Sequence, residues 1–182
     1  MGRYTVFVRL RLHDTFRFEV NGDMIRISVK AIILRDGKLL LNRCKQVNGE
    51  EYYDLPGGGQ ELYEPMEETV IREVLEETGY HIRILRFAAF GEEIYTDERL
   101  RLQYPDYTHR VFPIFLAALT DEPQEKPTEQ DVNMQEVLWV PVEETAELPR
   151  LCPPGLSEAL PRILQGASPV CLGTGWCDWP CV

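Results

Sequence analysis

The sequence predicts one α/β domain, a β-sheet into which a helix is inserted. Its 182 residues fit a single domain of ordinary size, and 44% hydrophobic with 27% charged residues is the composition of a folded globular protein. Short runs rich in β-branched and aromatic residues, separated by turn signals, indicate strands. One segment, 65–78, instead has helical periodicity.

The N-terminal part predicts two hairpins. Residues 4 to 20 alternate apolar with polar side chains, and an Asn-Gly turn signal follows them. A second hairpin is predicted over 31–41, where Asp36-Gly37 separates two apolar runs. Residues 1–24 are therefore interpreted as extra β-strands or a hairpin that precedes the main domain.

The helix at 65–78 is the best-defined element. Pro65 suits its first turn, and Gly79 suits the position just past its end. Beyond it the sequence predicts strands at about 82–90, 110–119 and 137–142, a Pro-rich and acidic loop at 121–131, a last helix at about 155–164, and an irregular tail with Cys and Trp at 166–182.

Charge and composition exclude several partners. A net charge of −11 opposes binding to long nucleic acids and to anionic membranes, because both depend on Lys and Arg. No stretch approaches the ~20 apolar residues of a membrane span, and no secretory signal is recognised, so a cytoplasmic location is predicted. Five unevenly spaced cysteines indicate reduced thiols rather than a disulfide framework or a zinc site.

A dense acidic cluster marks the helix. Between residues 61 and 77 there are seven glutamates and one cation, Arg72, and Glu73, Glu76 and Glu77 share one helix face. Like charges three or four residues apart oppose helix formation by roughly 0.2–0.5 kcal/mol per pair. A divalent cation removes this conflict, and hard oxygen ligands suit Mg²⁺, with Mn²⁺ as the alternative.

A glycine run at 57–59 precedes the helix and lets the backbone approach a ligand closely. The spacing from Gly58 through Glu64 to the segment 72–80 resembles the Nudix hydrolase box, glycine-x5-glutamate-x7-Arg-Glu-aliphatic-x-Glu-Glu-x-Gly-aliphatic, at every fixed position, with Tyr80 replacing the last aliphatic residue. The resemblance implies a Nudix-type α/β/α sandwich around a mixed β-sheet. The domain would span about residues 25–165.

The same resemblance implies hydrolysis of the diphosphate linkage of a nucleoside diphosphate derivative by metal-activated water. ADP-ribose, another nucleotide sugar and a nucleoside triphosphate are the expected small-molecule substrates. Carried over by position, Glu73 and Glu77 correspond to metal ligands, and Glu76 to a further ligand or the group that activates water. Gly57 would offer its carbonyl to the metal.

Other residues receive supporting roles from the resemblance. Arg72 would orient the glutamates by charge-assisted hydrogen bonds, and Glu64 would brace the site. Gly57 and Gly58 would contact substrate through their open backbone. Tyr52 and Tyr53 are candidates for stacking on a base, although packing within a strand is the commoner role of such residues, and Tyr53 is the one assigned to substrate binding. The general base remains open among four acids outside the box, namely Glu92, Glu93, Glu129 and Asp131.

The alternative function is a Nudix-fold nucleotide-binding or sensor domain without catalysis. Such domains usually lack a box glutamate, and here all of them are present. RNA decapping is opposed by the acidic balance of the chain, and isoprenoid diphosphate isomerisation by the intact box. Three roles are open for the extra N-terminal strands: they complete the sheet, form a dimer interface or cap the pocket. A homodimer is the favoured of these, because edge strands commonly pair across a two-fold axis.

Overall fold

The computed structural model describes residues 25–46, 48–129 and 133–178, so the strands expected within 1–24 lie outside the described residues. In chain order the elements are β1 (Ile25–Ile27), β2 (Lys30–Arg35), β3 (Lys38–Lys45), β4 (Glu51–Asp54), α1 (Met66–Thr78), β5 (Ile82–Tyr95), α2 (Glu98–Gln103), the 3₁₀ helix η1 (Pro105–Tyr107), β6 (His109–Leu119), β7 (Met134–Pro141), the 3₁₀ helix η2 (Val142–Glu147), β8 (Leu151–Cys152), α3 (Leu156–Leu164) and β9 (Val170–Cys177).

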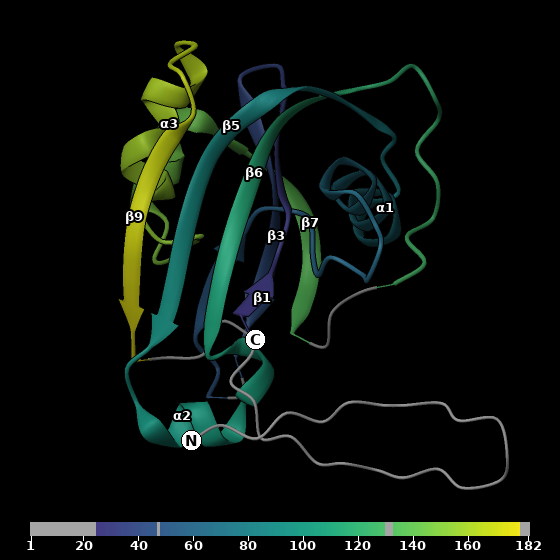
Figure 1. Ribbon diagram of the computed structural model, residues 1–182. Helices are drawn as coiled ribbons and strands as arrows, with labels where there is room; N and C mark the ends of the chain where they lie inside the picture. Colours follow the sequence, from purple (N-terminus) through teal and green to yellow (C-terminus); the bar gives the residue numbers. More distant parts are fainter. Residues whose placement is uncertain (1–24, 47, 130–132, 179–182) are drawn as a thin grey trace, which may run out of the picture.

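The strands form one mixed sheet. Their order is β8-β4-β3-β2-β6-β5-β9, with β1 also paired to β6 and β7 to β3. β2 lies antiparallel to β3 and parallel to β6, whereas β5 lies antiparallel to β6 and parallel to β9. In Figure 1 the helices α1 and α3 lie on opposite faces of this curled sheet. The α/β/α sandwich expected from the sequence is confirmed.

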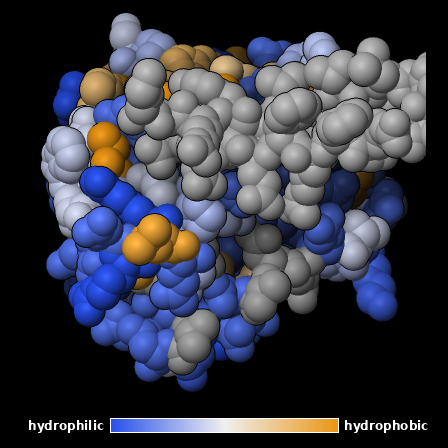
Figure 2. Space-filling view, turned by 60° about the horizontal axis from the view of Figure 1, so that its bottom comes forward, coloured by the Kyte–Doolittle hydropathy of each residue, from blue (hydrophilic) through white to orange (hydrophobic). Residues whose placement is uncertain are grey.

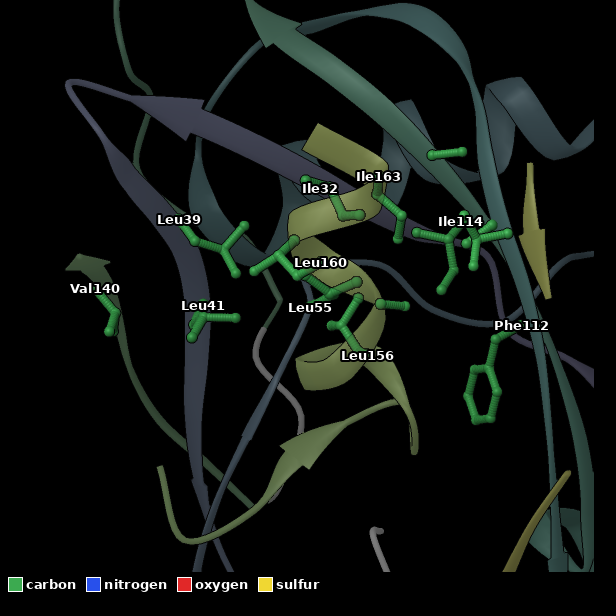
Figure 3. Close-up of a cluster of buried hydrophobic side chains, with 14 residues drawn as sticks. Ile32, Leu39, Leu41, Leu55, Phe112, Ile114, Val140, Leu156, Leu160 and Ile163 are labelled. Carbon is green, nitrogen blue, oxygen red and sulfur yellow. The ribbon is translucent and has the colours of Figure 1, made fainter. Parts of the chain in front are cut away.

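Two hydrophobic cores stabilise the two faces. Side chains alternate along a strand, so Leu39 and Leu41 of β3 enter one cluster and Leu40 enters the other. The first cluster includes the apolar side of α3, with Leu156 and Leu160, as Figure 3 shows. The second lies beneath α1. The sheet is therefore buried on both sides, and α1 is fixed to it through its apolar face.

The local signals of the central hairpin and of α1 are confirmed. Asp36 and Gly37 both have positive φ, as a tight hairpin turn between β2 and β3 requires. Pro65 is the extended N-cap residue of α1, and Gly79 ends the helix in the left-handed region at φ 71°. Its N–H donates to the carbonyl of Leu75, 2.8 Å away.

The tail expected to be irregular contains a strand, so that expectation is wrong for its central part. β9 pairs along β5 from Ala89↔Val170 to Tyr95↔Cys177. Hydrogen bonding to the edge of β5 orders this segment, although Gly173 and Gly175 interrupt any alternation of apolar side chains. The last residues of the tail, including Trp179 and Cys181, lie outside the described residues.

The surface at the α2 end of the molecule, brought forward in Figure 2, is largely hydrophilic with small hydrophobic spots. Among the described residues, no helix combines the length and apolar character that a membrane span needs.

Candidate active site

A cleft of about 490 Å³ lies where α1, the glycine run and the sheet meet. Acidic, basic and aromatic side chains from distant parts of the sequence line it: Glu73, Glu76, Glu77, Glu129 and Asp54; Arg26, Lys30 and Arg110; Tyr52, Tyr104 and Tyr107. The acidic helix face expected from the sequence therefore faces a cavity rather than bulk solvent alone, and cationic side chains line the same cavity.

The glycine run is held like an added strand beside residues 27–31. The N–H of Val29 donates to the carbonyl of Gly58 at 2.8 Å, and the N–H of Ala31 donates to that of Pro56 at 2.9 Å. Gly57 has φ 126°, and a β-carbon there would lie 2.2 Å from the Val29 carbonyl oxygen. This close approach requires glycine at position 57.

Arg72 binds three glutamates at once. Its Nε and Nη2 donate to the two carboxylate oxygens of Glu64 at 2.7 and 2.9 Å, and its Nη1 donates to Glu73 at 2.9 Å and to Glu76 at 3.0 Å. Its Nη2 also donates to the carbonyl of Gly59 at 3.3 Å. One guanidinium thus connects the helix to the glycine run and fixes the direction of two cleft carboxylates.

We predict that the loss of folding stability at acidic pH depends in part on Glu64. Hydrogen bonds from Arg72 hold the pKa of Glu64 at about 2, below its ordinary 4.5. Because the folded pKa is depressed, this stabilisation is present above about pH 4.5 and is lost as the pH falls towards 2. Denaturant unfolding of wild type and Glu64→Gln should therefore differ most near pH 7 and converge at low pH. A difference independent of pH, or the same convergence in the exposed Glu68→Gln, would contradict this assignment.

Glu77 and Glu73 are both less exposed than Glu76. Glu77 Oε2 accepts the N–H of Gly57 and the Asn42 amide, each at 2.9 Å. Burial raises the pKa of Glu73, although Arg72 opposes this effect. The two carboxylates are therefore oriented by the protein itself, at the end of the cleft nearest the glycine run.

A buried lysine contacts the same loop. Lys30 Nζ donates to Asp54 Oδ2 at 2.8 Å and to the Gly57 carbonyl at 2.7 Å. Burial lowers the pKa of Lys30, but attraction to Asp54 and Glu77 outweighs that effect, so the pKa is raised and the side chain is charged. The Gly57 carbonyl, expected at a metal, thus already accepts an ammonium and has one lone pair left.

The oxygen atoms that line the cleft are of the kind that binds a hard divalent cation. Two buried oxygen atoms that line it, Asn42 Oδ1 and Asp54 Oδ1, have no hydrogen-bond partner among the described residues. An unsatisfied buried oxygen costs free energy unless water or a cation completes it. Within the described part of the chain no three acidic, histidine or cysteine side chains are already gathered as a metal site. Arg72 instead holds Glu73 and Glu76 by one oxygen each.

Several sequence-predicted residues come together in the cleft, and one does not. Gly57, Gly58 and the three helix glutamates line it, and Glu64 and Arg72 support them. Tyr53 packs against the core beneath α3 and does not line the cleft; its neighbour Tyr52 lines it instead. This corrects the choice of Tyr53, because adjacent residues of β4 point to opposite faces of the sheet.

The four candidates for the general base differ in whether they line the cleft and in whether they already have a partner. Glu129 lines the cleft and is exposed. Glu93 is fully buried and ion-paired to Arg110, and Glu92 accepts hydrogen bonds from a histidine and a threonine. Asp131 lies outside the described residues. Sequence reasoning also missed the buried lysine, since nothing local in its strand distinguishes it.

The cleft thiol is not suited to nucleophilic catalysis. Burial, with a contribution from Asp54, raises the pKa of Cys44 to about 12. The thiolate is the nucleophilic form, and it is scarce at neutral pH for such a group.

Comparison with known proteins relates the chain to one family. A family model described as the NUDIX domain matches residues 24–162. The chain is similar to a MutT NUDIX hydrolase from Burkholderia pseudomallei, with 27% identity and a TM-score of 0.51 over 80% of this chain and 99% of that one. An ADP-ribose pyrophosphatase from Streptococcus suis (18% identity, TM-score 0.53, 81% of this chain and 99% of that one) and a UDP-X diphosphatase (21%, 0.58, 81% and 67%) share its fold.

Proposed function

The chain belongs to the NUDIX domain family, and from this premise we propose that it is a Mg²⁺-dependent pyrophosphohydrolase of a nucleoside diphosphate derivative. One observation carries the proposal. Arg72 holds Glu64, Glu73 and Glu76 together beside a glycine run, and Glu73 and Glu76 line a cleft that cationic side chains also line. Such a cleft accommodates a cation and a polyanionic substrate at the same time.

The proposed metal holders are the glutamates Glu73, Glu76 and Glu77. A bound divalent cation supplies charge neutralisation for phosphate oxygens and lowers the pKa of a water molecule. The chain's own groups hold this arrangement: Arg72 orients two of the carboxylates, while Asn42 and the Gly57 N–H orient the third.

The proton of the attacking water needs an acceptor in the cleft. Glu76 is half-buried and hydrogen-bonded to Arg72, whereas Glu129 reaches the cleft from the loop after β6. The backbone N–H groups of Thr128 and Glu129 donate to the Glu76 carbonyl at 2.9 and 3.1 Å, so the loop is tied to α1 beside both carboxylates. We assign water activation to this pair of acids, with Glu76 the first to test.

Both the family and the lining of the cleft support the proposed substrate class. Solved structures with this fold include proteins described as an ADP-ribose pyrophosphatase and a UDP-X diphosphatase. A cleft of about 490 Å³ lined by tyrosines and arginines has room for a nucleotide and offers aromatic surface for it. A nucleotide sugar such as ADP-ribose is our first candidate, and a nucleoside triphosphate is the second.

The decisive experiment is product analysis on a substrate panel. The protein is incubated with ADP-ribose, other nucleotide sugars, dinucleotides and nucleoside triphosphates in the presence of Mg²⁺, and the products are separated by chromatography. We expect release of a nucleoside monophosphate, its loss with EDTA and its recovery when Mg²⁺ is restored. AMP, which lacks the diphosphate linkage, is the matched control and should remain intact.

Two outcomes would redirect the proposal. Hydrolysis of AMP at the same rate would indicate phosphatase chemistry rather than cleavage of a diphosphate. Tight binding of a panel member without turnover would favour the sensor-domain function.

A further inference from the structure

Among the described residues that line the cleft, three side chains are cationic, and two of these have acidic partners. Lys30 pairs with Asp54 at 2.8 Å, and Arg110 pairs with the fully buried Glu93. The side chain of Arg26 makes no ion pair or hydrogen bond with any residue in the ranges 25–46, 48–129 and 133–178. Its charge is therefore available to a ligand in the cleft.

The backbone around Arg26 is fixed relative to the glycine run. β1 lies parallel to β6, with Arg26 opposite Arg110. The carbonyl of Ile27 accepts the N–H of Gln60 at 3.1 Å, and Ser28 forms a bridge with Gly59. The Arg26 guanidinium therefore starts from a strand that is bonded both to the sheet and to the glycine run.

An aromatic ring supports the side chain. The guanidinium carbon of Arg26 lies 5.0 Å from the ring centroid of Tyr107, in the range of a cation–π contact. Tyr107 ends η1 and also lines the cleft. The ring limits the motion of Arg26 and leaves its N–H groups available to a ligand, because a π-face does not use the in-plane donors.

Consecutive glycines bring this guanidinium close to the acidic side of the cleft. A β-carbon on Gly58 would lie 2.3 Å from Glu73 Oε2, and one on Gly59 would lie 2.5 Å from Arg26 Nη2. Adjacent α-carbons are about 3.8 Å apart. The Glu73 carboxylate and the Arg26 guanidinium thus approach neighbouring residues of one loop, and both side chains line the same cleft.

We propose that Arg26 is a substrate-binding residue that donates to phosphate oxygens of the substrate beside the glycine run, and that Tyr107 positions it. The inference rests on the proposed function for the identity of the anion. Arginine suits this role because its planar fork matches phosphate oxygens in a bidentate manner.

The test is Arg26→Gln with steady-state kinetics on whichever panel substrate is turned over. Loss of a charge-assisted hydrogen bond should raise KM roughly 10- to 100-fold with little change in kcat, because the contact is present in both ground and transition states. The Mg²⁺ concentration for half-maximal rate should not change, since Arg26 holds no cation. Arg83→Gln removes the same charge from an exposed part of β5 and should match wild type.

Two further variants separate binding from positioning. Tyr107→Leu removes the ring and should raise KM by less than Arg26→Gln does. Arg26→Lys keeps the charge without the fork and should give an intermediate KM. The inference would be overturned if Arg26→Gln left KM unchanged, or if Arg83→Gln raised KM as much as Arg26→Gln does.

If the protein proves not to be a hydrolase, a binding measurement can still test the role of Arg26. If wild type turns over no panel member, calorimetric titration with ADP-ribose and with inorganic pyrophosphate tests the anion site alone. Binding to wild type that weakens about 10-fold or more in Arg26→Gln would retain the inference without the enzyme. Equal binding to both proteins, or none to wild type, would reject it.

Discussion

Replacing Glu76 with glutamine is expected to lower kcat by about 10²- to 10⁴-fold while the protein stays folded. Glu76 lines the cleft, and its Oε2 accepts a hydrogen bond from Arg72 Nη1 at 3.0 Å. A glutamine oxygen can accept the same bond, so the side chain keeps its direction and size. What is lost is the negative charge, which both a cation ligand and a proton acceptor require.

The control lies on the same helix. Glu68 is exposed in the first turn of α1, so Glu68→Gln removes an equal charge away from the cleft and should leave kcat unchanged. Glu129→Gln tests the other acid assigned to water activation. Full activity in Glu76→Gln with loss in Glu129→Gln would transfer the role of base to Glu129; full activity in both would contradict our assignment of water activation.

The second large effect concerns stability. Lys30→Met is expected to reduce the free energy of unfolding by about 3 kcal/mol, in the range for breaking a buried ion pair. The side chains of Lys30 and Asp54 are only 8% and 17% exposed. Methionine fills a similar volume but leaves the Asp54 carboxylate and the Gly57 carbonyl without their shared donor. The remaining buried charge is the main cost.

Urea denaturation at neutral pH measures this effect, with a double variant as the critical comparison. Lys30→Met/Asp54→Asn removes both charges and should recover much of the lost stability, because no ionised group is then left unpaired. Lys38→Met, at the exposed start of β3, is the matched control and should change stability by less than about 0.5 kcal/mol. No recovery in the double variant would assign the loss to packing instead of charge.

The parts of the fold that the sequence predicted well are those with local signals. α1 begins after Pro65 and ends before Gly79, and each of these residues affects only the helical turn next to it. The β2-β3 turn follows from Asp36 and Gly37 alone. The acidic segment was predicted for the same reason, since residues within a helix keep a fixed angular relation to one another.

The rest depended on register and long-range pairing. Tyr52 rather than Tyr53 reaches the cleft because side chains alternate, and a shift of one residue changes the face of the sheet. Lys30 meets Asp54 only through the pairing of strands far apart in the chain. β9 is a strand because it pairs with the edge of β5, and nothing in the sequence of residues 170–177 identifies that partner.

The last turn of α1 carries Glu76 and Glu77 and no basic residue. Peptide dipoles leave a partial negative charge at the C-terminal end of a helix, so carboxylates there are placed where the helix favours them least. The arrangement concentrates negative potential in the cleft at the expense of helix stability. If the turn holds the proposed cation, stability and cation affinity impose opposite demands on it, because a lysine that suits the helix dipole would weaken the attraction for a cation.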